Sequence, residues 1–183
     1  MAKNKNMILP PVVLAVVCAV CCGLLAVVNS ITKDKIAAAE AAAIQESLSG
    51  LPDAGTFEAA EFTAPEMDKV QATGVYVDEN NQVAVLVTAD GYNKGGLQVV
   101  VGLDETGTVT GITFVSVTET PGLGTKVQSN PELLTDTLIG LSDGGAVDAV
   151  DGITGATYSS NGMKNAVKCA LETFAVNKEA ILK

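Results

Sequence analysis

The chain has 183 residues, of which 48% are apolar and 4% aromatic, and it contains neither His nor Trp. The absence of His excludes a Ser-His-Asp triad and a His-ligated zinc site. All eleven basic residues are Lys, and the net charge of −10 argues against nucleic acid as a partner, because such binding depends on neutralising phosphates.

The first predicted element is a membrane span over residues 7–28, a run of 22 residues without a charge. As a helix it reaches roughly 30 Å, the thickness of a bilayer's hydrocarbon core. A secretory signal is the alternative, but its apolar part is shorter and ends at a small-residue cleavage site. We therefore predict an uncleaved single-pass anchor in the cell membrane, in contact with membrane lipid.

The charges beside this span predict its orientation. Lys3, Lys5 and the terminal amine precede it, whereas Lys33 and Lys35 follow it. The positive-inside rule then places residues 1–6 in the cytoplasm and the C-terminal domain outside it.

Three of the four cysteines, Cys18, Cys21 and Cys22, lie within the span. They are either cluster ligands or, as we favour, small apolar residues that face lipid or another helix. Cys169 alone remains for the rest of the chain, so no disulfide within that part is expected.

Residues 29–70 are predicted to form a helical stalk, from Thr32 to Leu48, and an irregular acidic linker. Residues 71–183 are predicted to form one α+β domain with a twisted antiparallel sheet and flanking helices. Its sheet is a meander, because short β-rich runs alternate with turns rich in Asn, Asp and Gly; these runs cover residues 75–77, 83–88, 97–103 and 109–117.

Three further elements are predicted after the meander. A short helix opens at Ser129-Asn130-Pro131-Glu132 and ends near Gly140, and residues 146–150 form one more strand. The last helix starts around residues 158–160 and carries an apolar stripe made by Met163, Val167, Ala170, Leu171 and Phe174. Cys169 falls off this stripe, which indicates either an exposed thiol or, as is usual for a lone Cys in a helix, a structural or incidental residue.

One loop differs from ordinary scaffold: Glu119-Thr120-Pro121-Gly122-Leu123-Gly124-Thr125-Lys126. Its glycines permit positive φ or a close approach, and polar side chains surround Leu123. An ordinary connection between a strand and a helix explains the same residues.

The second unusual segment runs from Asp151 to Ser160 and is rich in Gly, Thr and Ser. It precedes a helix, whose unpaired N–H groups and dipole favour a phosphate. The alternative is that Thr157, Ser159 or Ser160 simply caps the helix, although one cap needs only one hydroxyl.

Both segments carry a family resemblance. Asp151-Gly152-Ile153-Thr154-Gly155-Ala156-Thr157 resembles the flavinylation motif Asp-x-x-Ser/Thr-Gly-Ala-Thr, and Glu119 to Gly124 resembles the Glu-Thr-Pro-Gly-Leu-Gly loop of the same FMN-binding domain. With the anchor in front, the chain resembles RnfG, the G component of the Rnf electron-transport complex. A sister family is the C component of the sodium-pumping NADH:quinone oxidoreductase.

The resemblance implies a role for particular residues. Thr157 would carry FMN as a phosphoester made by a separate flavin transferase, which reads Asp151, Thr154, Gly155, Ala156 and Thr157. Thr154, Gly155 and Ala156 would also contribute to cofactor binding. Thr120, Leu123, Gly124 and Lys126 would lie near the flavin, with Glu119 supporting the loop. Tyr158 packs on the sheet or on the flavin, and we expect the sheet.

The function implied is an electron relay in an ion-translocating ferredoxin:NAD oxidoreductase, with the other Rnf subunits (A, B, C, D and E) as partners. Because flavin carries electrons by itself, the subunit needs neither a catalytic residue nor a metal of its own, and it would not be an enzyme alone. The alternatives are the quinone-reductase component, a free-standing FMN-binding carrier and a cofactor-free anchored binding module.

Overall fold

The structure is a computed structural model that describes residues 5–182. It divides into two compact units, residues 1–42 and 43–183, which are described separately below. The first unit contains most of α1 (Lys5–Ser49), a single uninterrupted helix in which both the predicted span and the predicted stalk are helical. Among the described residues, α1 is the one helix long and apolar enough to cross a membrane.

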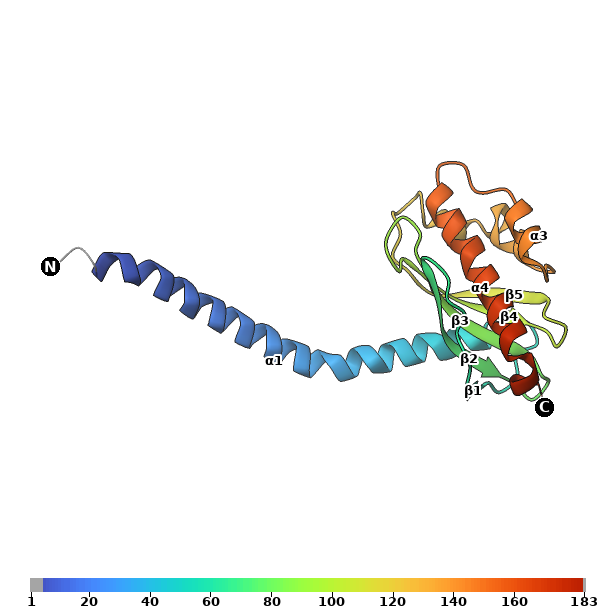
Figure 1. Cartoon of the computed structure of the whole chain (residues 1–183), viewed down its shortest axis with the longest axis horizontal. Coiled ribbons are helices and arrows are strands. Elements are labelled where there is room, and N and C mark those ends of the chain that lie inside the picture. Colours follow the sequence, from blue (N-terminus) through green and yellow to red (C-terminus); the bar gives the residue numbers. More distant parts are fainter. Residues whose placement is uncertain (1–4, 183) are drawn as a thin grey trace. The chain divides into compact units, whose positions relative to one another are not determined.

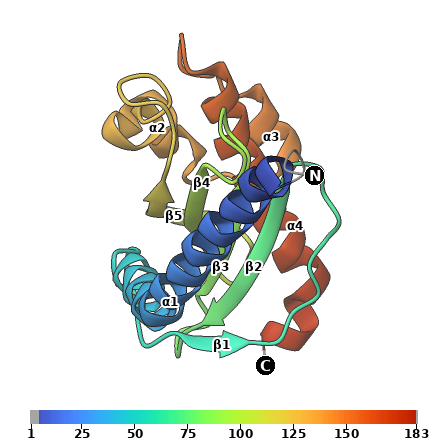
Figure 2. The same ribbon diagram turned by 90° about the vertical axis from the view of Figure 1, so that its left-hand side faces the viewer.

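The second unit is built on a five-stranded antiparallel sheet with strand order β1-β2-β3-β4-β5, which confirms the predicted α+β meander (Figure 2). The strands are β1 (Glu58–Ala60), β2 (Val70–Val77), β3 (Val83–Ala89), β4 (Leu97–Leu103) and β5 (Val109–Val117). β1 lies inside the segment expected to be irregular, where it pairs with the end of β2.

Carboxylates build two of the turns that join these strands. Asp78 is buried and accepts hydrogen bonds from the backbone N–H groups of Asn80 and Gln82 between β2 and β3. Asp104 does the same for Thr106 and Thr108 between β4 and β5. Burial opposes ionisation of Asp104, but the hydrogen bond from the Thr106 hydroxyl and the backbone bonds together outweigh it and lower the pKa of the Asp104 carboxyl group.

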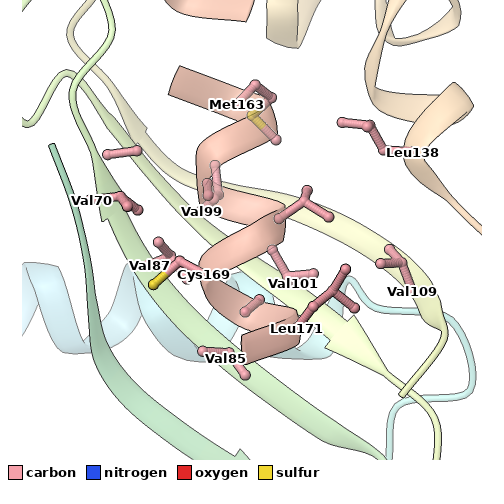
Figure 3. Packing of buried hydrophobic residues seen from close by; sticks show 14 of the residues in the cluster. Val70, Val85, Val87, Val99, Val101, Val109, Leu138, Met163, Cys169 and Leu171 are labelled. Carbon is pink, nitrogen blue, oxygen red and sulfur yellow. The ribbon is translucent and has the colours of Figure 1, made fainter. Parts of the chain in front are cut away.

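The long helix α4 (Thr157–Ile181) covers one face of the sheet and forms the main core with it (Figures 1 and 3). All five residues of its predicted stripe are buried, which confirms that prediction. Of the two alternatives for Cys169, the exposed thiol is wrong, because the buried face of α4 is wider than the stripe and includes Ala166 and Cys169. Burial raises the pKa of the Cys169 thiol, so it stays protonated.

The opposite face of the sheet is covered by the last two turns of α1, which belong to the second unit. Leu48 and Leu51 pack there against Ala84, Leu86 and Val100. The Thr113 hydroxyl donates a 2.8 Å hydrogen bond to the carbonyl of Ser47. The residues of β3 from Val83 to Leu86 are buried on both faces for this reason.

Two predictions between the meander and α4 are wrong. The helix expected up to Gly140 is instead α2 (Lys126–Ser129) followed by two 3-10 turns, η1 (Pro131–Leu133) and η2 (Thr135–Leu138). Leu134 interrupts the helical path with φ −151° as its side chain enters the core. The predicted strand over 146–150 is a helix, α3 (Gly144–Ala149), because Asp143 caps it by accepting the N–H of Ala146.

Candidate functional site

A cavity of about 360 Å³ lies where the two unusual segments meet, at the N-terminal end of α4. This volume falls within the range of roughly 300–1,000 Å³ that is typical of small-molecule sites. The cavity is lined by Tyr92, Thr120, Leu123, Gly124, Gly155, Ala156, Thr157, Tyr158 and Ser159. Six of the predicted site residues are therefore brought together, and no charged side chain lines the cavity.

Glu119 links the segments that form the walls of this cavity through hydrogen bonds of its carboxylate. Its side chain is only 5% exposed. The carboxylate accepts hydrogen bonds from the N–H of Tyr92 at 3.0 Å, the N–H of Asn93 at 3.1 Å and the hydroxyl of Ser159 at 2.5 Å. One residue thus joins the β3–β4 loop, its own loop and the first turn of α4, which gives the predicted supporting role of Glu119 a geometric basis.

Glycines make room for this carboxylate. A Cβ atom on Gly91 would lie 2.6 Å from Oε1 of Glu119, and one on Gly124 would lie 2.7 Å from both Oε2 of Glu119 and Oγ of Ser159. A Cβ on Gly96 would also collide with Oε1 of Glu119. Glycine at positions 91, 96 and 124 is therefore a packing requirement of the buried carboxylate.

The Ser and Thr hydroxyls at the start of α4 lie in different surroundings. Ser159 donates to Glu119, and Ser160 accepts the N–H of Ile153 at 2.9 Å. The N-cap residue is Ala156, so in the described structure no side chain caps α4. The capping alternative is thus wrong, and the side chain of Thr157 lies exposed on the cavity wall.

The loop after β5 presents Leu123 to the same cavity. The carbonyl of Thr120 accepts the N–H groups of Leu123 and Gly124, which makes a tight turn. Gly122 has φ +73°, a conformation that glycine adopts without strain. The turn leaves Leu123 50% exposed, with its side chain at the cavity wall.

The remaining predicted site residues lie outside the cavity lining. Asp151 and Thr154 are exposed on the segment that leads into α4, and Lys126 is half-buried at the start of α2. Their predicted roles stay predictions.

Two tyrosines complete the cavity, and the motifs in the sequence do not point to the first of them, Tyr92. Tyr92 was not singled out, although an aromatic residue within the Gly91–Gly96 loop was a usable signal. Tyr158 was expected to pack on the sheet; instead it is 69% exposed, because position 158 points away from the buried face of α4. The two rings meet edge to face with centroids 6.1 Å apart.

A larger cavity, of about 630 Å³, lies beside β1 and the end of α4. Its lining includes Glu58, Glu61, Asp78 and Glu79. Such a wall repels an anionic ligand, so its size does not make it a phosphate-bearing cofactor site. Within residues 5–182, no three His, Cys, Asp or Glu side chains are grouped as metal ligands.

Comparison with known proteins decides the family. An FMN-binding domain model matches residues 91–172, and an RnfG N-terminal region model matches residues 1–51. The G component of the ion-translocating oxidoreductase complex of Vibrio atlanticus is 30% identical over 93% of this chain and 91% of its own length. The chain belongs to the RnfG family.

Other relatives carry the same name as the Vibrio protein. The RnfG relative from Shewanella piezotolerans is 28% identical over 98% of this chain and 94% of its own length. That of Escherichia coli K12 is 36% identical over 59% of both chains.

The geometry of the smaller cavity fits the FMN-binding domain. All nine lining residues fall within the matched residues 91–172, whereas the larger cavity lies outside them. The first turn of α4 offers backbone N–H groups and the positive end of its dipole to a phosphate. The tyrosines and Leu123 offer an apolar wall to a flat ring.

Proposed function

We propose that this chain is an electron-relaying flavoprotein subunit of an ion-translocating ferredoxin:NAD oxidoreductase, with FMN esterified through its phosphate to the hydroxyl of Thr157. Bound FMN supplies one- and two-electron transfer, so the chain needs no acid, base or metal for the redox chemistry. The relatives, which are named as components of an ion-translocating oxidoreductase complex, favour this reading over the quinone-reductase component. The FMN-binding domain argues against a cofactor-free module.

The proposal rests on the difference between the hydroxyls of the first turn of α4: two have partners within the protein, and the third lies exposed. Ser159 and Ser160 are bound inside the protein, to Glu119 and Ile153, whereas the Thr157 side chain is exposed on the cavity wall. It also lies in the first turn of α4, where the helix dipole stabilises an attached phosphate. Among these three hydroxyls, Thr157 is the one open to modification.

Other residues of the motif have a position that suits recognition by a flavin transferase. Asp151 and Thr154 are exposed on a segment fixed by the Ser160–Ile153 hydrogen bond and by Gly155 at φ +82°. A second protein can therefore reach them without unfolding α4. We assign these two residues to maturation, with the transferase as the partner.

The membrane helix tethers the domain to its complex. We propose that α1 crosses the cell membrane with the N-terminus inside, so that the FMN domain works outside the cytoplasm among the other Rnf subunits. A covalent ester retains the cofactor in a compartment where free FMN is scarce.

The test is co-expression of the full chain with a flavin transferase, followed by a denaturing gel viewed for flavin fluorescence. The wild-type band should fluoresce and Thr157→Ala should be dark, whereas Thr56→Ala, which changes another exposed threonine, should fluoresce. Peptide mass mapping of residues 147–164 should place the added mass on Thr157. A dark wild-type band, or a fluorescent Thr157→Ala band, would overturn the proposal.

A further inference from the structure

Two tyrosines with largely exposed side chains lie at the mouth of the FMN-domain cavity. Tyr92 is 70% and Tyr158 69% exposed, although their rings touch edge to face at an interplanar angle of 75°. They come from different parts of the chain, the β3–β4 loop and the first turn of α4. Neither ring contributes to the core of the domain.

Exposed apolar side chains are concentrated at this mouth. Within residues 43–182 six large hydrophobic side chains are exposed, and three of them, Tyr92, Leu123 and Tyr158, line this one cavity. An exposed apolar surface gathered at one place marks a binding site, because each side chain gains by being covered.

Both rings are attached to backbone that is held in place. Glu119 binds the N–H of Tyr92 directly, and it binds the hydroxyl of Ser159, the residue after Tyr158. The backbone at both positions is therefore ordered before a ligand binds, which lowers the entropic cost of binding there.

The geometry points to Tyr92 and Tyr158 as the residues that contact the isoalloxazine ring of the flavin, with Leu123 against the same ring from the facing loop. This inference rests on the proposed function, since Thr157 would deliver the ring to this cavity. Aromatic rings prefer offset-stacked or edge-to-face neighbours, and the two tyrosines offer both a face and an edge. Their role is to position the ring and to shield it from water.

Fluorescence gives a direct readout, because a tyrosine or tryptophan ring that touches a flavin quenches its emission. The chain has no Trp and only three Tyr, so few side chains contribute. The third, Tyr76, packs in the cluster on the opposite face of the sheet and provides the matched control.

The experiment uses the full chain in detergent, flavinylated by co-expression, with attachment verified on a denaturing gel. The measured quantity is the flavin emission of the native protein divided by that of the same sample after unfolding. Tyr158→Leu and Tyr92→Leu should each raise this ratio several-fold, Tyr158→Trp should lower it, and Tyr76→Phe should leave it unchanged. A purely structural role would not produce opposite shifts for Leu and Trp at one position.

The two proposals fail in different ways. If the flavin is attached at Thr157 but the ratio is the same in wild type and in all three variants of Tyr92 and Tyr158, the rings serve another purpose, such as docking a protein, and the inference is wrong. If wild type carries no flavin, the proposed function fails and this inference with it. Should Tyr92→Leu not fold, Tyr158→Leu and Tyr158→Trp still decide the outcome, because Tyr158 is exposed on a stable helix.

Discussion

The hydroxyl of Ser159 donates a 2.5 Å hydrogen bond to the carboxylate of Glu119, which lies forty residues earlier in the chain. Through this bond the loop after β5 and the first turn of α4 hold one geometry. The same carboxylate fixes Tyr92 and Asn93. The candidate site therefore depends on a single buried acidic residue.

Replacing this carboxylate should destabilise the domain. In Glu119→Gln the amide nitrogen cannot accept a hydrogen bond, so the backbone N–H of either Tyr92 or Asn93 loses its acceptor and is left unpaired at a cost of about 1–3 kcal/mol. Thermal unfolding of the full chain in detergent measures the change. Glu105→Gln, at an exposed turn position, is the control and should unfold with wild type. Equal unfolding temperatures for Glu119→Gln and wild type would contradict the arrangement.

Gly124→Ala should impair the site more than an alanine elsewhere. The added methyl group would lie 2.7 Å from Oγ of Ser159 and from Glu119, so the loop must move away from α4. We expect a lower unfolding temperature and weaker flavin fluorescence on a denaturing gel. Gly144→Ala is the matched control, because its nearest neighbours are 3.7 Å away. Normal flavinylation and stability in Gly124→Ala would show that the loop packs less tightly.

Asp104 should make a small contribution to stability that depends on pH. Its pKa is below the ordinary value of 3.8 in the folded protein, so the ionised form stabilises the fold above pH 3.8. This stabilisation is lost as the pH falls through the lowered pKa. Unfolding temperatures of wild type and Asp104→Asn should differ at pH 6 and converge towards pH 3. A difference that stays constant across this range would exclude ionisation as its source.

Cys169 should react slowly with water-soluble thiol reagents in the folded protein. It is fully buried, and burial raises the pKa of its thiol, so the reactive thiolate is scarce at neutral pH. Mass mapping of the residue 169 peptide after labelling, with and without denaturant, measures this protection. Rapid labelling under native conditions would show that α4 separates readily from the sheet.

Long periodic segments were predictable from sequence, and short ones were not. The strands over 97–103 and 109–117 have the predicted bounds, and the apolar stripe of α4 is buried. The predictions for residues 126–150 were wrong because each helix there spans only a few residues and its position depends on contacts outside the helix itself. An example is the Thr135 hydroxyl, which donates to the carbonyl of Val127 inside the core.

The candidate site was predictable only as far as its motifs extended. Thr120, Leu123 and Thr157 were predictable because they lie within the two segments that resemble known motifs. The partnership of Glu119 with Tyr92 spans 27 residues and joins two loops, so no local pattern announces it. The exposure of Tyr158 depends on which face of α4 meets the sheet at its first turn.

The last turns of α1 have a practical consequence for releasing the domain from its tether. Leu48, with Ile44 beside it, shields one side of the sheet, and Ser47 is bonded to Thr113 and Phe114. Proteolytic cleavage or gene truncation at Gly50 would remove this cover. The apolar face of the sheet would then be exposed to solvent and prone to aggregation. A water-soluble fragment that keeps its shape must therefore begin upstream of Ile44.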